Sequence, residues 1–102
     1  MIKEIKDNDM SPVTSSKLAL VDFNATWCGP CKMLAPVLKE LDEERTDIEF
    51  FSVDVDANPV LSITNKIHSV PTLMLYKNGE VVDKSIGYST RDELVDWLNS
   101  IC

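Results

Sequence analysis

The sequence predicts one α/β domain, spanning residues 1–102, in which a mixed five-stranded sheet is flanked by helices on both faces. The length of 102 residues suits a single hydrophobic core. Apolar runs typical of strands and segments of helical spacing follow one another in the order strand, helix, strand, helix, strand, helix, strand, strand, helix. Asn78-Gly79 joins the last two strands as a tight hairpin, so the sheet contains an antiparallel pair.

The first three expected elements precede residue 24. Ile2–Ile5 is interpreted as a short first strand. Ser11 and Pro12 offer an N-cap and a first-turn proline, so a brief helix is expected there. Leu18–Phe23 is almost continuously apolar, which is typical of a strand covered on both faces in the middle of a sheet. We therefore place the central strand at Leu18–Phe23.

A long helix is expected after the central strand. Apolar residues recur at helical spacing from Pro30, which suits a first-turn position, to about Glu44. Pro36 inside this helix removes one backbone hydrogen bond, so we expect a kink near the second turn. Ile48–Val55 then forms another buried strand.

The last part of the chain contains a short helix, the hairpin and a final helix. Asn58-Pro59 provides an N-cap and a proline that begin a helix ending near Asn65. Thr72–Tyr76 and Glu80–Lys84 are the two strands of the hairpin. Thr90-Arg91-Asp92-Glu93 fits a capping box, and the helix after it has one apolar face formed by Leu94, Val95, Leu98 and Ile101.

Composition excludes several classes of function. Hydrophobic residues make up 44% and charged residues 26%, which is typical of a globular protein with a real core. The net charge of −7 argues against a nucleic-acid partner, because phosphate binding needs clustered Lys and Arg. No apolar run approaches the roughly 20 residues that cross a bilayer, and Met1–Ile5 lacks the long apolar stretch of a secretory signal. We therefore expect a cytoplasmic protein.

Two of the three cysteines lie in the segment Trp27-Cys28-Gly29-Pro30-Cys31-Lys32, between the central strand and the long helix. Reactive groups are commonly presented at such a strand-to-helix junction. The odd number and close spacing of the cysteines argue against a structural disulfide framework and favour a chemical role. Two alternatives stay open: half of a zinc site, for which only His68 and Cys102 offer further ligands, and a pair of inert core residues.

The two cysteines have different expected roles. A Cys28 thiolate at a helix N-terminus is stabilised by free backbone N–H groups and by the partial positive charge there. Cys31 lies about one helical turn further along, close enough to attack a disulfide formed at Cys28. We expect Cys28 to be the exposed nucleophile and Cys31 the buried resolving thiol that releases the reduced substrate. Pro30 between them restricts the backbone.

The motif, followed by Met33-Leu34-Ala35-Pro36, resembles the active-site segment of the thioredoxin family. The resemblance covers most of the chain beyond roughly the first sixteen residues, through Val21-Asp22-Phe23, Val53-Asp54-Val55-Asp56, Val70-Pro71-Thr72, Lys77-Asn78-Gly79-Glu80 and Gly87. It implies the thioredoxin fold and a protein-disulfide reductase that needs no cofactor or metal and maintains cell redox homeostasis. It also implies that Cys28 and Cys31 alternate between a dithiol and a disulfide.

The resemblance further implies a substrate-binding surface around the cysteine pair. Pro71 matches a proline that the family holds in cis, and a cis bond costs little before proline. It is expected to form a shallow apolar groove for an extended substrate segment, together with Trp27, Gly29, Pro30, Val70 and Gly87. The alternative for Pro71 is an ordinary trans turn before the strand.

Asp22 lies within the expected central strand, where a carboxylate has a desolvation cost unless it has a partner or a role. The resemblance implies that Asp22 accepts the proton of the resolving cysteine through water, and burial should raise its pKa toward the working range. An Asp at a frayed strand edge is the alternative.

The family's tryptophan just before the motif is Asn24 here, and a lysine often found near the buried aspartate aligns with Ser52. Losing that positive charge favours a protonated Asp22.

Two functions from different classes remain. Disulfide reduction is favoured by Gly29-Pro30, because related oxidising domains carry a histidine within the dipeptide and glutaredoxins a Pro-Tyr pair. The expected partners of such a monomeric reductase are disulfide-containing proteins and a thioredoxin reductase. A binding module that uses the groove without turnover is the alternative.

Cys102 is expected to be an exposed, incidental thiol. A regulatory or intermolecular disulfide at Cys102 is the alternative. His68 is expected to be a surface residue.

Overall fold

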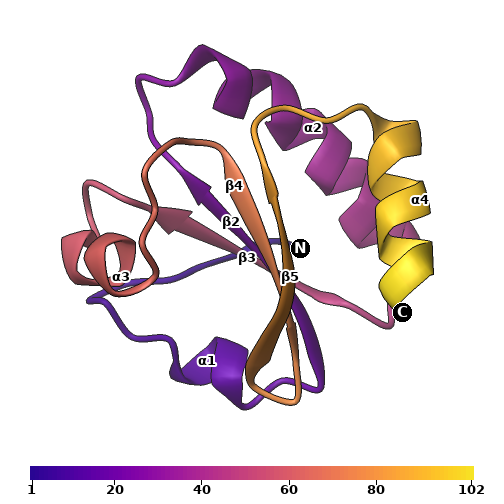
Figure 1. Cartoon of the computed structure of the whole chain (residues 1–102), viewed down its shortest axis with the longest axis horizontal. Coiled ribbons are helices and arrows are strands. Elements are labelled where there is room, and N and C mark those ends of the chain that lie inside the picture. Colours follow the sequence, from indigo (N-terminus) through magenta and orange to yellow (C-terminus); the bar gives the residue numbers. More distant parts are fainter.

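The computed structural model describes all 102 residues and contains the expected order of elements (Figure 1). No helix is both long and apolar enough to cross a lipid bilayer. The elements are β1 (Lys3–Glu4), α1 (Ser11–Thr14), β2 (Leu18–Asn24), α2 (Gly29–Glu44), β3 (Glu49–Asp54), α3 (Pro59–Thr64), β4 (Thr72–Lys77), β5 (Glu80–Ile86) and α4 (Arg91–Ile101).

The sheet is mixed, with the strand order β1-β3-β2-β4-β5. Strands β1, β3 and β2 run parallel, whereas β4 is antiparallel to both β2 and β5. Helices α2 and α4 cover one face of the sheet, and α1 and α3 cover the other (Figure 1). This architecture confirms the predicted fold class and places β2 in the middle of the sheet.

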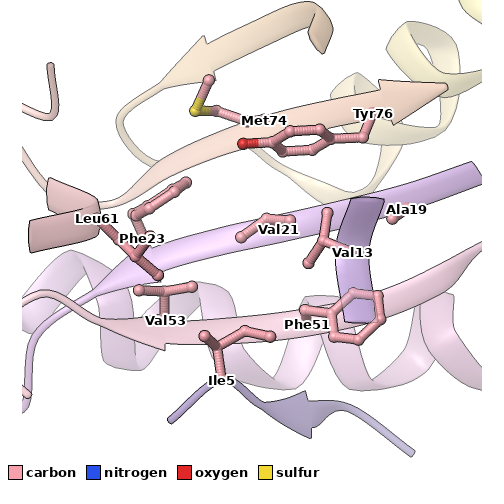
Figure 2. Close-up of a cluster of buried hydrophobic side chains, with 10 residues drawn as sticks. All are labelled: Ile5, Val13, Ala19, Val21, Phe23, Phe51, Val53, Leu61, Met74 and Tyr76. Atoms are coloured by element: carbon pink, nitrogen blue, oxygen red, sulfur yellow. The ribbon is translucent and has the colours of Figure 1, made fainter. Parts of the chain in front are cut away.

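Each face of the sheet has its own hydrophobic core, because successive side chains of a strand point to opposite faces. On one face, Phe23 and its alternate neighbours on β2 pack with Val13 of α1 and Leu61 of α3 (Figure 2). On the other face, Leu20 packs with leucines of α2 and α4. The prediction that the central strand is covered on both faces is therefore confirmed. The second core is formed by Leu20, Leu34, Leu38, Leu41, Ile48, Phe50, Leu73, Leu75, Leu94 and Leu98.

Most predicted boundaries agree with the structure to within one or two residues. Strand β3 is one residue shorter at each end than predicted, and β5 continues to Ile86 instead of ending at Lys84. Helix α2 runs through Pro36 and ends at Glu44 as expected. The capping box of α4 is present, since the Glu93 N–H donates to Thr90 Oγ1 and the Thr90 N–H to Glu93 Oε1.

The predicted N-cap of α1 is wrong. Ser11 is the first residue of the helix, and Met10 occupies the N-cap position without a side-chain hydrogen bond. The Ser11 N–H donates to Asp9 Oδ1 at 3.0 Å instead. The acceptor for the start of this helix therefore comes from two residues upstream.

The start of α3 is capped from outside its own segment. Asn58 occupies the N-cap position, but its side-chain amide donates to backbone carbonyls of Ile5 and Asp54. The N–H groups of Val60 and Leu61 donate to Asn8 Oδ1 at 3.0 and 3.2 Å. The loop between β1 and α1 thus satisfies the free donors of α3, which ties the N-terminal segment to the third helix.

Replacing Asn8 tests this long-range cap. Asn8→Ala should lower the free energy of unfolding by ~2 kcal/mol, because it removes the acceptor and places alanine at a left-handed backbone position with φ of 55°. Chemical denaturation of the oxidised protein measures the change. Asn8→Asp keeps the acceptor and tolerates this backbone, so it serves as the control. Equal stability of Asn8→Ala and the wild type would contradict the assignment.

Candidate active site

The cysteine pair lies where the central strand passes into the long helix. Cys28 is the N-cap residue of α2, and the Cys31 N–H donates to Cys28 Sγ at 3.2 Å. The two cysteines form a disulfide with their Cα atoms 5.3 Å apart. A sulfur at this position accepts from an otherwise free donor at the positive end of the helix dipole, as predicted. The geometry thus favours negative charge on Cys28 when the pair is reduced.

The expectation that Cys28 is exposed is wrong in this disulfide form. Cys28 is 4% exposed and Cys31 5%, because both pack in a small apolar cluster with Ala25 and the half-buried Val70. Cys28 Sγ also lies 3.5 Å from the carbonyl oxygen of Val70. Burial therefore does not distinguish the two cysteines. They differ in the groups that surround each sulfur.

The chain order of the sheet brings Val70 and Pro71 to the disulfide. Strand β4 is antiparallel to β2, so the start of β4 lies beside the end of β2, with Thr72 opposite Phe23. The Val70–Pro71 peptide bond is cis, as the resemblance implied, and the trans alternative is wrong. The Gly87 N–H donates to the carbonyl oxygen of Pro71 at 2.8 Å. This bond ties the residue after β5 to the cis proline.

The surface beside the disulfide is partly apolar. Trp27 is 69% exposed, and its Nε1–H donates to Asp56 Oδ2 at 2.9 Å. Gly29 and Pro30 are exposed at the start of α2. A hollow of about 150 Å³ is lined by Trp27, Val55, Ser62, Ile67, His68, Ser69 and Val70.

Only part of the predicted groove lies in this hollow. Trp27 and Val70 line it, whereas Gly29, Pro30, Pro71 and Gly87 are not among its lining residues. His68 is exposed, as predicted. Sequence reasoning missed Asp56, which orients the tryptophan. The only signal for Asp56 in the sequence was its place just after β3. Because β3 is parallel to β2, the two strands end at the same edge of the sheet.

Asp22 is a buried carboxyl group in the middle of β2. It pairs with Ser52 on one side and Leu73 on the other, and it is 8% exposed. The alternative of a frayed strand edge is therefore wrong. Burial raises the pKa of Asp22 from its ordinary value of 3.8 to about 6, while a hydrogen bond from Asn24 acts in the opposite direction.

A cavity of about 240 Å³ connects Asp22 with Cys31. Its lining also includes Lys32 of α2 and the polar residues Asn24 and Ser52, but not Cys28. The volume is several times the roughly 30 Å³ that one water molecule takes up in the liquid. The two sulfurs thus have different neighbours: Cys31 shares a cavity with the carboxyl group, and Cys28 lies against Val70.

The third cysteine is separate from this site. Cys102 is a free thiol after the end of α4, and its predicted exposure is confirmed. No three His, Cys, Asp or Glu side chains are arranged to hold a metal ion.

A disulfide across the first turn of a helix, at the end of a central strand and beside a buried carboxyl group, defines a thiol–disulfide oxidoreductase. The chain belongs to the thioredoxin family, whose model, described as Thioredoxin, matches residues 2–100. The thioredoxin of Listeria monocytogenes is 47% identical over 100 residues, covering 97% of both chains. The thioredoxin of Bacillus subtilis is 42% identical over 99 residues, covering 96% of this chain and 95% of the relative.

A solved structure agrees with this assignment. A mutant thioredoxin from Halobacterium salinarum matches with a TM-score of 0.86 and 38% sequence identity, covering 96% of this chain and 88% of that chain. The fold is therefore the thioredoxin fold. The family and the cysteine pair at disulfide distance together support dithiol–disulfide redox chemistry as the function of this chain.

The buried carboxyl group makes stability depend on pH. The pKa of Asp22 is about 6 in the folded protein against 3.8 ordinarily, so the native state holds this proton more tightly and loses stability as pH rises through about 6. Asp22→Asn does not ionise and escapes this loss. It should gain ~3 kcal/mol relative to the wild type near pH 8, and the pH-dependent part of the gain should vanish as pH falls toward ~4.

Denaturant unfolding of both oxidised proteins across this pH range measures the difference. A stability difference that stays constant with pH would contradict the raised pKa.

Proposed function

We propose that this protein reduces disulfide bonds in other proteins, with Cys28 as the nucleophile, Cys31 as the resolving thiol and Asp22 as the group that takes the proton of Cys31. One observation carries the assignment of roles: Asp22 and Cys31 line the same cavity, and Cys28 does not. Cys28 accepts the N–H of Cys31, an interaction that favours the thiolate of Cys28.

The proposed reaction has two steps. The Cys28 thiolate attacks a substrate disulfide, whose S–S bond breaks to give a mixed disulfide and one substrate thiol. Cys31 then loses its proton to Asp22 and attacks Cys28 Sγ, which releases the second substrate thiol and leaves the Cys28–Cys31 disulfide. Two electrons pass from the dithiol to the substrate, and an external reductase returns them.

The substrate is proposed to bind along the surface formed by Trp27, Gly29, Pro30, Val70, Pro71 and Gly87. The exposed indole of Trp27 and the half-buried Val70 offer apolar surface beside the sulfur that reacts first. The hydrogen bond from Trp27 to Asp56 limits the motion of the indole, which lowers the entropy lost when a substrate packs on it. An extended segment suits such a surface because its side chains alternate.

The family implies disulfide-containing substrates and reductase partners in general. The electron donor proposed for this chain is a thioredoxin reductase. We propose a monomeric protein of one domain, residues 1–102, because the two cores share strand β2. A cytoplasmic location is proposed because a reducing compartment keeps thiols available. The net charge of −7 disfavours a nucleic-acid partner.

Insulin-disulfide reduction with a thioredoxin reductase as electron source tests the roles of the cysteines. Cys28→Ser should abolish turnover, because it removes the nucleophile. In Cys31→Ser, Cys28 should still attack the substrate disulfide, but the mixed disulfide should accumulate. Non-reducing gels and mass spectrometry detect this species. Asp22→Asn should slow release of the mixed disulfide more than its formation.

The control is Cys102→Ser, which should behave as the wild type because Cys102 lies outside the site. Full turnover by Cys28→Ser would contradict the role of Cys28 as the nucleophile. Equal slowing of both steps in Asp22→Asn would contradict the role of Asp22 as the proton acceptor.

Loss of the indole tests the binding surface. Trp27→Ala should raise KM for a protein disulfide about tenfold, since a large aromatic contact contributes ~1–2 kcal/mol to binding. The rate with a small aromatic disulfide should change much less. Met33→Ala is the matched control, because Met33 is similarly exposed at 61% but lies outside the proposed surface. A similar rise in KM for both variants would argue against a specific role of Trp27.

A further inference from the structure

Asn24 and Ser52 surround the carboxyl group of Asp22. Asn24 lies two residues after Asp22 on β2, so both side chains point to the same face of the sheet. The parallel register of β2 and β3 places Ser52 directly beside Asp22. Asn24 Nδ2 lies 3.1 Å from Asp22 Oδ2, 3.1 Å from the backbone oxygen of Asp22 and 2.7 Å from Ser52 Oγ. The three residues form one hydrogen-bonded group.

The direction of these hydrogen bonds is fixed by chemistry. An amide nitrogen can only donate, so both Asp22 Oδ2 and Ser52 Oγ accept from Asn24. The other carboxyl oxygen, Asp22 Oδ1, is buried and has no hydrogen-bond partner among the protein atoms. The hydrogen bond from Asn24 to Oδ2 is therefore the side-chain contact that fixes the orientation of the carboxyl group.

We propose that Asn24, held by Ser52, is a positioning residue for Asp22: its amide bonds to Oδ2 and fixes the orientation in which the carboxyl group exchanges a proton with Cys31. This inference rests on the proposed role of Asp22 in disulfide reduction and adds the residue that orients it. The cavity that Asp22 shares with Cys31 is large enough for water to carry this proton.

Other charged groups face Asp22 from only some of the neighbouring elements. From α2, Cys31 and Lys32 line the shared cavity. From β4, the paired residue is the uncharged Leu73. A second, polar cavity of about 440 Å³ lies beyond Asn24 and Ser52, and its charged residues are Glu4, Lys6, Asp7 and Asp54.

Asn24 and Ser52 line both cavities, so the amide stands between Asp22 and this second group of charges. Its hydrogen bond favours the ionised carboxylate and partly offsets the effect of burial on the pKa of Asp22. Removing the amide should therefore raise the pH at which Asp22 ionises.

The experiment uses Asn24→Leu, which keeps the branched shape of the side chain and removes the donor. The carboxyl carbon of Asp22 is followed by NMR as a function of pH, with Asp22→Asn used to assign the signal. Its midpoint should move up by about one pH unit, the effect of one hydrogen bond to a charged group. The pH profile for release of the mixed disulfide should move by the same amount, while its formation stays unchanged.

Ser52→Ala provides a second test that does not depend on how Asn24→Leu folds. It removes the anchor of the amide, so it should move both midpoints in the same direction by a smaller amount. Thr26→Val is the control, because Thr26 lines the second cavity without a hydrogen bond to Asp22, and it should leave both midpoints in place. The inference is overturned if Asn24→Leu and Ser52→Ala titrate as the wild type.

The role of Asp22 and the role of Asn24 can be tested separately. If Asp22→Asn releases the mixed disulfide at the wild-type rate, the proposed role of Asp22 fails and the inference about proton exchange fails with it. If Asp22→Asn slows release but the NMR midpoint and the release profile of Asn24→Leu are unshifted, the inference alone fails.

Discussion

The redox site depends on strand β2 being paired on both edges and covered on both faces. A strand held in this way cannot shift its register without moving apolar side chains from one core to the other. Its end is therefore a rigid point, and Cys28 begins α2 only a few residues beyond it. The antiparallel pairing of β4 brings the cis Val70–Pro71 bond to the same point. The geometry around the sulfur thus follows from the packing of the whole sheet.

The same constraint explains why the site contains a buried carboxyl group at a cost in stability. Asp22 lies on the central strand between Leu20 and Asn24 on the same face, and its partner on β4 is Leu73. Burial favours its neutral form, and this places the pKa of Asp22 near 6, close to the pH at which a proton acceptor works well. The hydrogen bond from Asn24 opposes that shift. The balance between burial and one amide donor therefore sets when the group can take a proton.

Much of the fold could be predicted because several signals are local. Continuous apolar residues identified β2, the Asn78-Gly79 pair identified the hairpin, and Thr90 with Glu93 identified the start of α4. The N-cap of α1 was assigned wrongly and that of α3 correctly to Asn58, but in both helices the side-chain acceptor is another residue, Asp9 for α1 and Asn8 for α3. A helix start is satisfied by any acceptor that tertiary packing brings within reach, and Asn8 is far from α3 in the sequence.

The sequence by itself determined the chemistry of this protein: two cysteines one helical turn apart, the Gly-Pro pair between them and an aspartate within an apolar strand. These are local features, and their spacing along a strand and a helix decides which groups share a face. The tertiary structure decided the environment of each group. Both cysteines are buried, Asp22 faces Cys31 across a cavity, and Asn24 bonds to Ser52 of the neighbouring strand. Contacts of this kind depend on strand register and packing between distant segments, which no local pattern in the chain specifies.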